Sequence, residues 1–196
     1  MQILELTVDE ASKRLSGLVR LLHDCVESGA SVGFLPPLQP GEAEAYWASV
    51  ADCLAEGSRV LLAALDGDLL VGCVQLDYAT RPNASHRAEV MKLMVHTSAR
   101  NRGIGRALMK RAAAVAARSG RTLLVLDTRS GDPSESLYTR LGYTTAGVIP
   151  RYAAAPLGSS TPPRSCISIC PRPPQSCRAP ASEIHVCKFC QPQQTL

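Results

Sequence analysis

The spacing of apolar residues near the start of the chain predicts a short strand followed by two helices. The segment 2–8 is largely apolar and suits a short strand. Leucines and valines then recur at helical spacing, so we expect a helix over about 10–27 with Asp9 as its N-cap. Gly and Pro residues mark 28–41 as a loop. A second helix is expected over about 42–56.

Two continuous apolar runs predict a β-hairpin. The runs 59–65 and 69–78 flank the turn Asp66-Gly67-Asp68, and an Asp-Gly pair between apolar runs is a strong hairpin signal. A further turn at 80–86 leads into an apolar stretch at 87–96. We therefore expect three neighbouring strands in this part of the chain.

Helical and strand patterns alternate in the following segment. A helix is expected over about 104–119, ended by Gly120, and a buried strand over 122–128. A short helix over about 133–141 and a last strand over 143–149 complete the pattern. This order of elements predicts an α/β fold with a mixed central sheet flanked by helices.

The composition changes near Pro156. Eight of the chain's 14 prolines and five of its eight cysteines lie in the last 41 residues, with little periodicity. Such a segment buries too little apolar surface to offset the entropy lost on ordering. We therefore expect a folded domain over 1–155 and a mostly disordered tail over 156–196. The best strand candidate within the tail is 184–189.

The tail cysteines raise the alternative of a zinc site. Cys187 and Cys190 have the spacing of a ligand pair, whereas Cys166 and Cys170 are separated by three residues rather than two. We expect no metal. The start of the chain does not resemble a secretory signal, so a disulfide framework is not expected either.

Composition and charge argue against several kinds of partner. Apolar residues make up 45% of the chain and charged residues 19%, which is typical of a globular protein. Much of the net charge of +4 comes from one segment, 100–111, rather than from a broad basic field, so we expect no nucleic-acid partner. No apolar stretch approaches the roughly 20 residues that cross a bilayer, so we expect no membrane partner and a cytoplasmic location.

An arginine-rich loop precedes the predicted helix at 104–119. The first N–H groups of a helix have no partners within it, and its dipole places partial positive charge at that end. Gly103 and Gly105 allow close approach to the backbone, and Arg100, Arg102 and Arg106 can neutralise a pyrophosphate. The alternative is a basic helix start on the surface, which the dipole disfavours.

The spacing of this loop excludes two common phosphate-binding motifs. The chain has no G-x-x-x-x-G-K-[ST] run, and position 108, where a G-x-G-x-x-G fingerprint needs its third glycine, is Leu108. The run Arg100-Asn101-Arg102-Gly103-Ile104-Gly105 is R-x-x-G-x-G, and Leu137-Tyr138-x-x-Leu141-Gly142-Tyr143 follows after a helix and a strand. Together they resemble the signature of the GNAT superfamily of N-acyltransferases, over roughly residues 1–152. The stretches 29–34 and 88–95 resemble the tabtoxin-resistance type of acetyltransferase.

The resemblance implies a GNAT-like fold, acetyl-CoA as co-substrate and a set of residues that bind it. The pyrophosphate would rest on the backbone after the motif strand. The pantetheine arm would lie along the edge of that strand, in a slot between splayed strands at 87–96 and 122–128. The implied cofactor-binding residues are Leu93, Met94, Val95, Arg100, Asn101, Arg102, Gly103, Ile104, Gly105 and Arg106.

Three residues are candidates for catalysis. By resemblance, Tyr138 serves the leaving sulfur; the alternative is a core tyrosine. Glu89 and Asp127 are carboxylates within strands that line the slot, where desolvation disfavours them unless they face a polar cavity. We expect a general base or amine anchor at these two positions. The alternative is that basic residues or backbone groups satisfy both carboxylates.

The loop at 28–41 and the helix at 42–56 are expected to cover the acceptor. Phe34, Tyr46 and Trp47 are candidates for walling its pocket, although aromatic residues in helices more often belong to the core. We expect a small-molecule amine of the antibiotic or toxin type as acceptor. The alternatives are a protein amine or a non-catalytic acyl-CoA-binding module. Dimers are common among relatives, which suggests a homodimer.

Two features depart from the family pattern. Where many members carry a pantetheine-binding Asn, this chain has Ser134 and Glu135. The family also supplies a final strand beside 143–149, and the Pro- and Cys-rich tail stands in its place. Loss of that strand would expose a sheet edge, so we expect reduced stability. Truncation near residue 158 should then change stability little.

Overall fold

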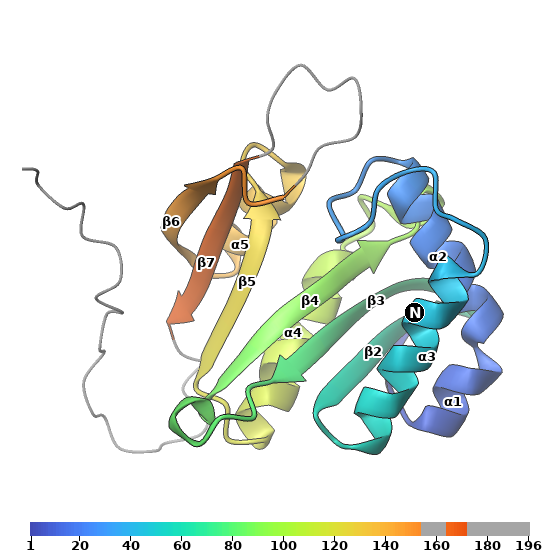
Figure 1. The fold of residues 1–196 in the computed structure, drawn as a ribbon, viewed down its shortest axis with the longest axis horizontal. Coiled ribbons are helices and arrows are strands. Elements are labelled where there is room, and N and C mark those ends of the chain that lie inside the picture. The colour runs from blue at the N-terminus through green and yellow to red at the C-terminus, as the bar shows by residue number, and fades with distance from the viewer. Residues whose placement is uncertain (154–163, 172–196) are drawn as a thin grey trace, which may run out of the picture.

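The computed structural model describes residues 1–153, with side chains, and the backbone of 164–171. It contains one seven-stranded sheet in the order β1-β2-β3-β4-β5-β7-β6 (Figure 1). Neighbouring strands are antiparallel except β4 and β5, so the sheet is mixed, as predicted. The elements are β1 Gln2–Leu6, α1 Val8–Lys13, α2 Leu15–Glu27, α3 Glu42–Ala55, β2 Arg59–Asp66, β3 Leu69–Tyr78, β4 Arg87–Val95, α4 Ile104–Arg118, β5 Leu123–Arg129, α5 Pro133–Arg140, β6 Thr144–Pro150 and β7 Arg164–Pro171.

The predicted helix over 10–27 is two helices, α1 and α2, which meet at Arg14. The cap of α1 is Thr7 rather than Asp9. The Thr7 hydroxyl accepts the Glu10 N–H at 3.3 Å, and the Glu10 carboxylate accepts the Thr7 N–H at 2.9 Å. This capping box was visible in the sequence as Thr7-x-x-Glu10. The prediction of Asp9 as the cap was therefore wrong.

Helices cover both faces of the sheet and divide the core into two layers. One layer lies between the sheet and helices α1–α3 and is built from leucines and valines with Cys25, Trp47 and Cys73. The second lies between the sheet and α4 and α5, and includes Leu108 and Met109 of α4. Figure 1 shows α1, α2 and α3 on one side of the strands and α4 on the other. The predicted layers are confirmed.

A strand that the sequence did not predict completes the sheet. β7 lies between β5 and β6 and pairs antiparallel with both, from Arg129↔Ser165 to Leu123↔Pro171 on the β5 side. The expectation that the chain lacks this strand was wrong. Ile167-Ser168-Ile169 does alternate as a strand should, but prolines on both sides hid the pattern. The candidate strand at 184–189 lies outside the described residues, and the domain boundary at 155 stays a prediction.

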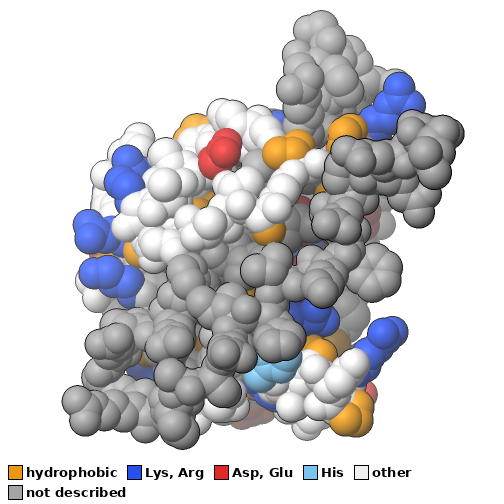
Figure 2. Space-filling model, turned by 90° about the vertical axis from the view of Figure 1, so that its left-hand side faces the viewer, with side chains coloured by type: hydrophobic (Ala, Val, Ile, Leu, Met, Phe, Trp, Pro, Cys, Tyr) orange, Lys and Arg blue, Asp and Glu red, His pale blue; other side chains and the backbone are white. Residues whose placement is uncertain are grey.

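The surface of the described residues shows no single dominant character on the face drawn in Figure 2. Basic side chains lie near its edges, and apolar side chains are scattered singly or in small groups. No helix in the described part of the chain is both long and apolar enough to cross a membrane.

Candidate active site

The central feature of the sheet is the divergence of its two parallel strands. β4 and β5 pair only at Arg87↔Leu123, Ala88↔Leu124 and Glu89↔Val125. Beyond Glu89, β4 remains paired with β3 as far as Val95, while β5 turns away toward β7, as Figure 1 shows. The divergence predicted for 87–96 and 122–128 is thus confirmed. Peptide groups on the free edge of β4 can therefore bind an extended ligand, since the described residues place no strand against them.

Helix α4 begins beside this divergence, and its first turn is shaped for an anion. Gly103, the N-cap residue, has a φ of 77°. Because it has no side chain, no hydrogen bond from this residue caps the first N–H groups of the helix. An added Cβ at Gly103 would meet no atom within 4 Å, so the approach to the backbone is open. Ile104 is 2% exposed and anchors the helix start in the core. The N–H groups of the first turn are therefore oriented outward at a site that favours negative charge.

Two of the three arginines in this loop have protein partners. Arg102 donates to the Asp66 carboxylate at 2.7 Å, and this guanidinium lowers the pKa of Asp66. Arg100 donates to the Ser28 hydroxyl at 2.7 Å and to the Val95 carbonyl at 3.2 Å. Arg106 is exposed on the first turn of α4. The sequence interpretation assigned all three to an anion; in the structure, Arg100 and Arg102 also hold the loop in place.

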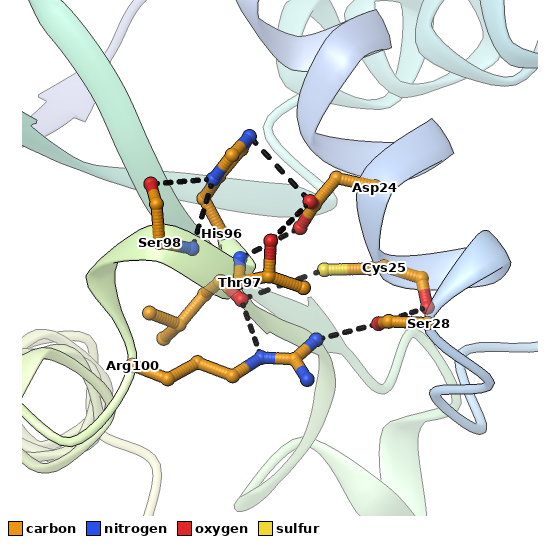
Figure 3. A network of polar contacts seen from close by, with 8 residues as sticks. Asp24, Cys25, Ser28, His96, Thr97, Ser98 and Arg100 are labelled. Atoms are coloured by element: carbon orange, nitrogen blue, oxygen red, sulfur yellow. Dashed lines mark hydrogen bonds and ion pairs between the residues drawn. The ribbon is translucent and has the colours of Figure 1, made fainter.

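A polar network ties the end of α2 to the loop after β4 (Figure 3). The Asp24 carboxylate accepts the Thr97 N–H at 2.7 Å and the Thr97 hydroxyl at 2.6 Å, while His96 Nε2 lies 3.5 Å from it. Ser28 accepts from Arg100 and donates to the Cys25 carbonyl at 2.9 Å. The network fixes both the arginine-rich loop at 100–106, here called the anion loop, and the start of the 28–41 loop. Sequence reasoning missed it, because Asp24 and Thr97 are 73 residues apart and no local pattern links them.

Three carboxylates lie on one face of the sheet where β4 and β5 separate. Glu89 is opposite Asp77 on β3 and beside Val125 on β5, and Asp127 follows Val125 by two residues, so all three acids share that face. Asp77 is neutralised by Arg59, whose Nε and Nη2 donate to it at 2.9 and 2.7 Å. Glu89 has no such partner among the described residues and remains partly exposed.

The surroundings of Glu89 favour its neutral form. Partial burial raises the pKa of the Glu89 carboxyl, and the negative charges of Asp127 and Asp77 raise it further. A carboxyl whose pKa lies closer to neutrality is a stronger proton acceptor than an ordinary one. Glu89 and Asp127 are therefore brought together as the sequence predicted, and their catalytic roles stay predictions.

Lys92 is a further residue at this site, and sequence reasoning gave it no role of its own. Its Nζ lies 5.2 Å from the centre of the Phe34 ring and 5.3 Å from that of Tyr46. Burial lowers the pKa of the Lys92 ammonium, although Asp127 and Glu89 oppose that shift. The cation–π contacts hold the 28–41 loop against β4. No pattern in the sequence indicated these cation–π contacts, because Lys92 is a single polar residue within a predicted strand.

Of the three aromatic residues predicted to wall the acceptor pocket, Phe34 and Trp47 have different surroundings. Phe34 packs edge-on against Tyr46, with ring centres 5.2 Å apart, and lines a pocket of about 240 Å³ between 29–36, Arg129 and Ala153. Trp47 is only 3% exposed and belongs to the core layer under α3. Phe34 thus offers its ring to a ligand, whereas Trp47 does not. Trp47 is not available to a ligand because its position on α3 directs the side chain toward the sheet.

Tyr138 lies on α5 within the core layer beneath α4. It is 7% exposed, and its ring centre is 5.7 Å from that of Tyr143. Burial raises the pKa of the Tyr138 hydroxyl, with smaller contributions from Asp132 and Asp127, so this group is a proton donor rather than a base. Its surroundings suit a core tyrosine as well, so its role at the leaving sulfur stays a prediction.

Comparison with known proteins agrees with this arrangement. Residues 22–143 match the model of the acetyltransferase (GNAT) family. The chain belongs to the GNAT family of acetyltransferases. The matched region contains β4, the anion loop, α4 and Tyr138.

Solved structures of GNAT proteins share the fold at low sequence identity. A ribosomal-protein-alanine N-acetyltransferase from Brucella melitensis aligns with a TM-score of 0.72 at 19% identity, covering 86% of this chain and 98% of that one. The protein yncA from Salmonella typhimurium, solved with its cofactor acetyl-CoA, gives 0.72 at 16% identity over 93% and 98%. An N-acetyltransferase from Staphylococcus aureus Mu50 gives 0.70 at 15% identity over 86% and 96%.

The described side chains contain no group of three His, Cys, Asp or Glu residues placed to hold a metal ion. The tail cysteines considered for zinc lie outside the side chains that the structure describes.

Proposed function

We propose that this GNAT acetyltransferase transfers the acetyl group of acetyl-CoA to the amine of a small molecule. The observation that carries the proposal is the divergence of β4 and β5 directly beside the start of α4. The diphosphate would lie on the first turn of α4, where Gly103 leaves the backbone open. The pantetheine arm would follow the free edge of β4 at 93–95. Acetyl-CoA supplies a thioester, and the protein supplies proton transfer and positioning.

The amine must lose a proton before it can attack. A free aliphatic amine resembles Lys, with a pKa of about 10.4, and is mostly an ammonium ion at neutral pH. Glu89 and Asp127 attract that cation, and Glu89 accepts its proton directly or through water. As the nitrogen bonds to the acetyl carbon and the carbon–sulfur bond breaks, the Tyr138 hydroxyl donates a proton to the sulfur. The attacking nitrogen releases its second proton as the amide forms, and that proton returns to the Tyr138 oxygen, directly or through water.

The small volume of the pocket, about 240 Å³, favours a small acceptor over a protein. Arg129 Nη1 lies 3.5 Å from the Gly29 carbonyl, so the loop lies against the end of β5 beside that pocket. An antibiotic or toxin amine would fit that size. The cytoplasmic location and a homodimer remain predictions from the sequence.

The test is release of the coenzyme thiol from acetyl-CoA with a panel of small amines and, in a second arm, short peptides. Acetylation of small amines with little turnover of peptides supports the proposal, and preference for peptides would contradict it. A third result, coenzyme binding without thiol release for any amine, would favour a non-catalytic acyl-CoA-binding module.

A further inference from the structure

Arg129 lies at the end of β5, beside the 28–41 loop. Its Nε is buried and has no hydrogen-bond acceptor in the described part of the chain. Its Nη1 reaches only the Gly29 carbonyl, at the long distance of 3.5 Å. A guanidinium carries five donors in a planar fork, and buried donors without acceptors are costly. This side chain therefore has hydrogen-bonding capacity that the described residues leave unused.

The space beside Arg129 is a half-open pocket. It has a volume of about 240 Å³, and its other walls are largely apolar: Ala30, Phe34, Leu35, Pro36 and Ala153. Among the lining residues Arg129 is the one with a formal charge. A single arginine in an apolar pocket favours an anionic ligand group, and a carboxylate matches its fork with two parallel hydrogen bonds.

Strand geometry connects this pocket to the acetyl-transfer face. Leu124, Leu126 and Thr128 are buried toward α4 and α5, so Asp127 and Arg129 share the opposite face of β5. Two residues along a strand are about 7 Å apart at Cα. Among the described ion pairs none joins Asp127 to Arg129. The two opposite charges therefore lie on the same face of β5 without forming an ion pair.

Phe34 provides the second link. The same ring lines the pocket beside Arg129 and contacts Lys92 of β4, which lies at the acidic face. A ligand against Phe34 therefore has the guanidinium at one end and Lys92 at the other, with Glu89 and Asp127 beyond Lys92 on the acidic face.

We propose that the acceptor is a primary amine that also carries a carboxylate, as in an amino acid, and that Arg129 binds the carboxylate. The amine is then directed toward Asp127 and Glu89. This inference rests on the proposed function and names its substrate class. Arg129 would determine specificity without taking part in proton transfer.

The first arm of the test compares L-amino acids with their carboxamides as acceptors. The wild-type protein should acetylate the acids with the higher kcat/KM. Arg129→Gln should lower kcat/KM for the acids about 10- to 100-fold, mainly through KM, and leave the carboxamides nearly unchanged. Arg129→Lys should recover part of the loss. Arg140→Gln, an exposed arginine that bonds Ser136, is the matched control and should change neither.

The second arm measures binding without turnover, by saturation-transfer NMR of the same compounds with the CoA-loaded protein. It distinguishes failure of the proposed function from failure of the inference about Arg129. If no compound is acetylated but the acids bind through Arg129, the proposed function fails and the anion site stands. If the carboxamides bind as well as the acids, or Arg129→Gln leaves the preference for acids intact, the inference is wrong.

Discussion

The two halves of the sheet differ in how their strands meet. From β1 to β4, neighbouring strands pair along most of their length, and core positions such as Leu62, Ala63 and Val74 are fully buried. From β4 to β5 only three residue pairs join the strands, and Glu89 and Asp127 remain on an open face. The paired half provides stability, whereas the separated half provides a place to bind.

This difference shows why acids occur inside strands here. A carboxylate in a fully paired strand needs a partner, as Asp77 on β3 has in Arg59. At the divergence, Glu89 has neighbours on both sides and still reaches solvent. The position costs some stability and yields a carboxyl whose pKa is raised toward neutrality.

The largest expected effect follows from removing β7, which joins β5 to β6. Deletion of 164–196 takes out the middle strand of the second half and exposes both neighbours. We expect the free energy of unfolding to fall by more than about 4 kcal/mol. Deletion of 172–196 leaves β7 in place and is the control. Denaturant unfolding of both proteins measures the difference; equal stabilities would show that β7 does not hold this half together.

Gly103→Asp tests the anion site at the start of α4. A side chain at a φ of 77° is strained by about 1–2 kcal/mol, and the carboxylate would repel a diphosphate. We expect CoA affinity to fall more than about 100-fold, in line with several lost charge-assisted hydrogen bonds. Gly120→Asp, at a φ of 73° beyond the other end of α4, imposes the same strain. If both variants lost CoA equally, the effect would be one of folding.

Glu89→Gln removes the proposed base. We expect kcat to fall by about 10²-fold or more, with CoA affinity unchanged. Wild-type kcat should fall as the pH drops through the raised pKa of Glu89, and the variant should lack that limb. An unchanged pH–rate profile would exclude Glu89 as the base.

The same substitution has a predicted effect on stability. Because the folded-state pKa of Glu89 is raised above 4.5, its contribution to stability is full below that pH and is lost as the pH rises through the folded value. The Glu89→Gln variant should therefore be more stable than wild type at pH 7. At pH 3, where Glu89 is protonated in both states, the variant should have no such advantage. Thermal unfolding at both pH values measures this.

Tyr138→Phe should have a smaller effect. Loss of the proton donor should lower kcat by less than Glu89→Gln does, while leaving CoA affinity and stability nearly unchanged. Tyr78→Phe, which removes a hydroxyl that donates to Ser119 at the C-terminal end of α4, is the control. If kcat were unaffected, Tyr138 would be a core residue only.

The sequence predicted the paired half of the sheet well because its signals are local. The Asp-Gly turn between two apolar runs specified β2 and β3, and the R-x-x-G-x-G loop specified the start of α4. Local signals also place Glu89 and Asp127 in strands, and strand pairing then brings them to one face.

The remaining features depend on contacts between distant segments. Asp24 and Thr97, Lys92 and Phe34, and Arg129 and Gly29 meet only in the folded chain. β7 was missed for a different reason, since its alternating pattern is short and lies among prolines. Arg102 was assigned to an anion because its partner Asp66, the last residue of β2, lies 36 residues away in the sequence.

The central claim is that the divergence of β4 and β5, with the start of α4, binds a coenzyme A thioester. Isothermal titration of the full-length protein with CoA tests it most directly. The account predicts saturable heat with one site per chain and a Kd of about micromolar, near −8 kcal/mol. Absence of saturable heat with folded protein at millimolar CoA would contradict it.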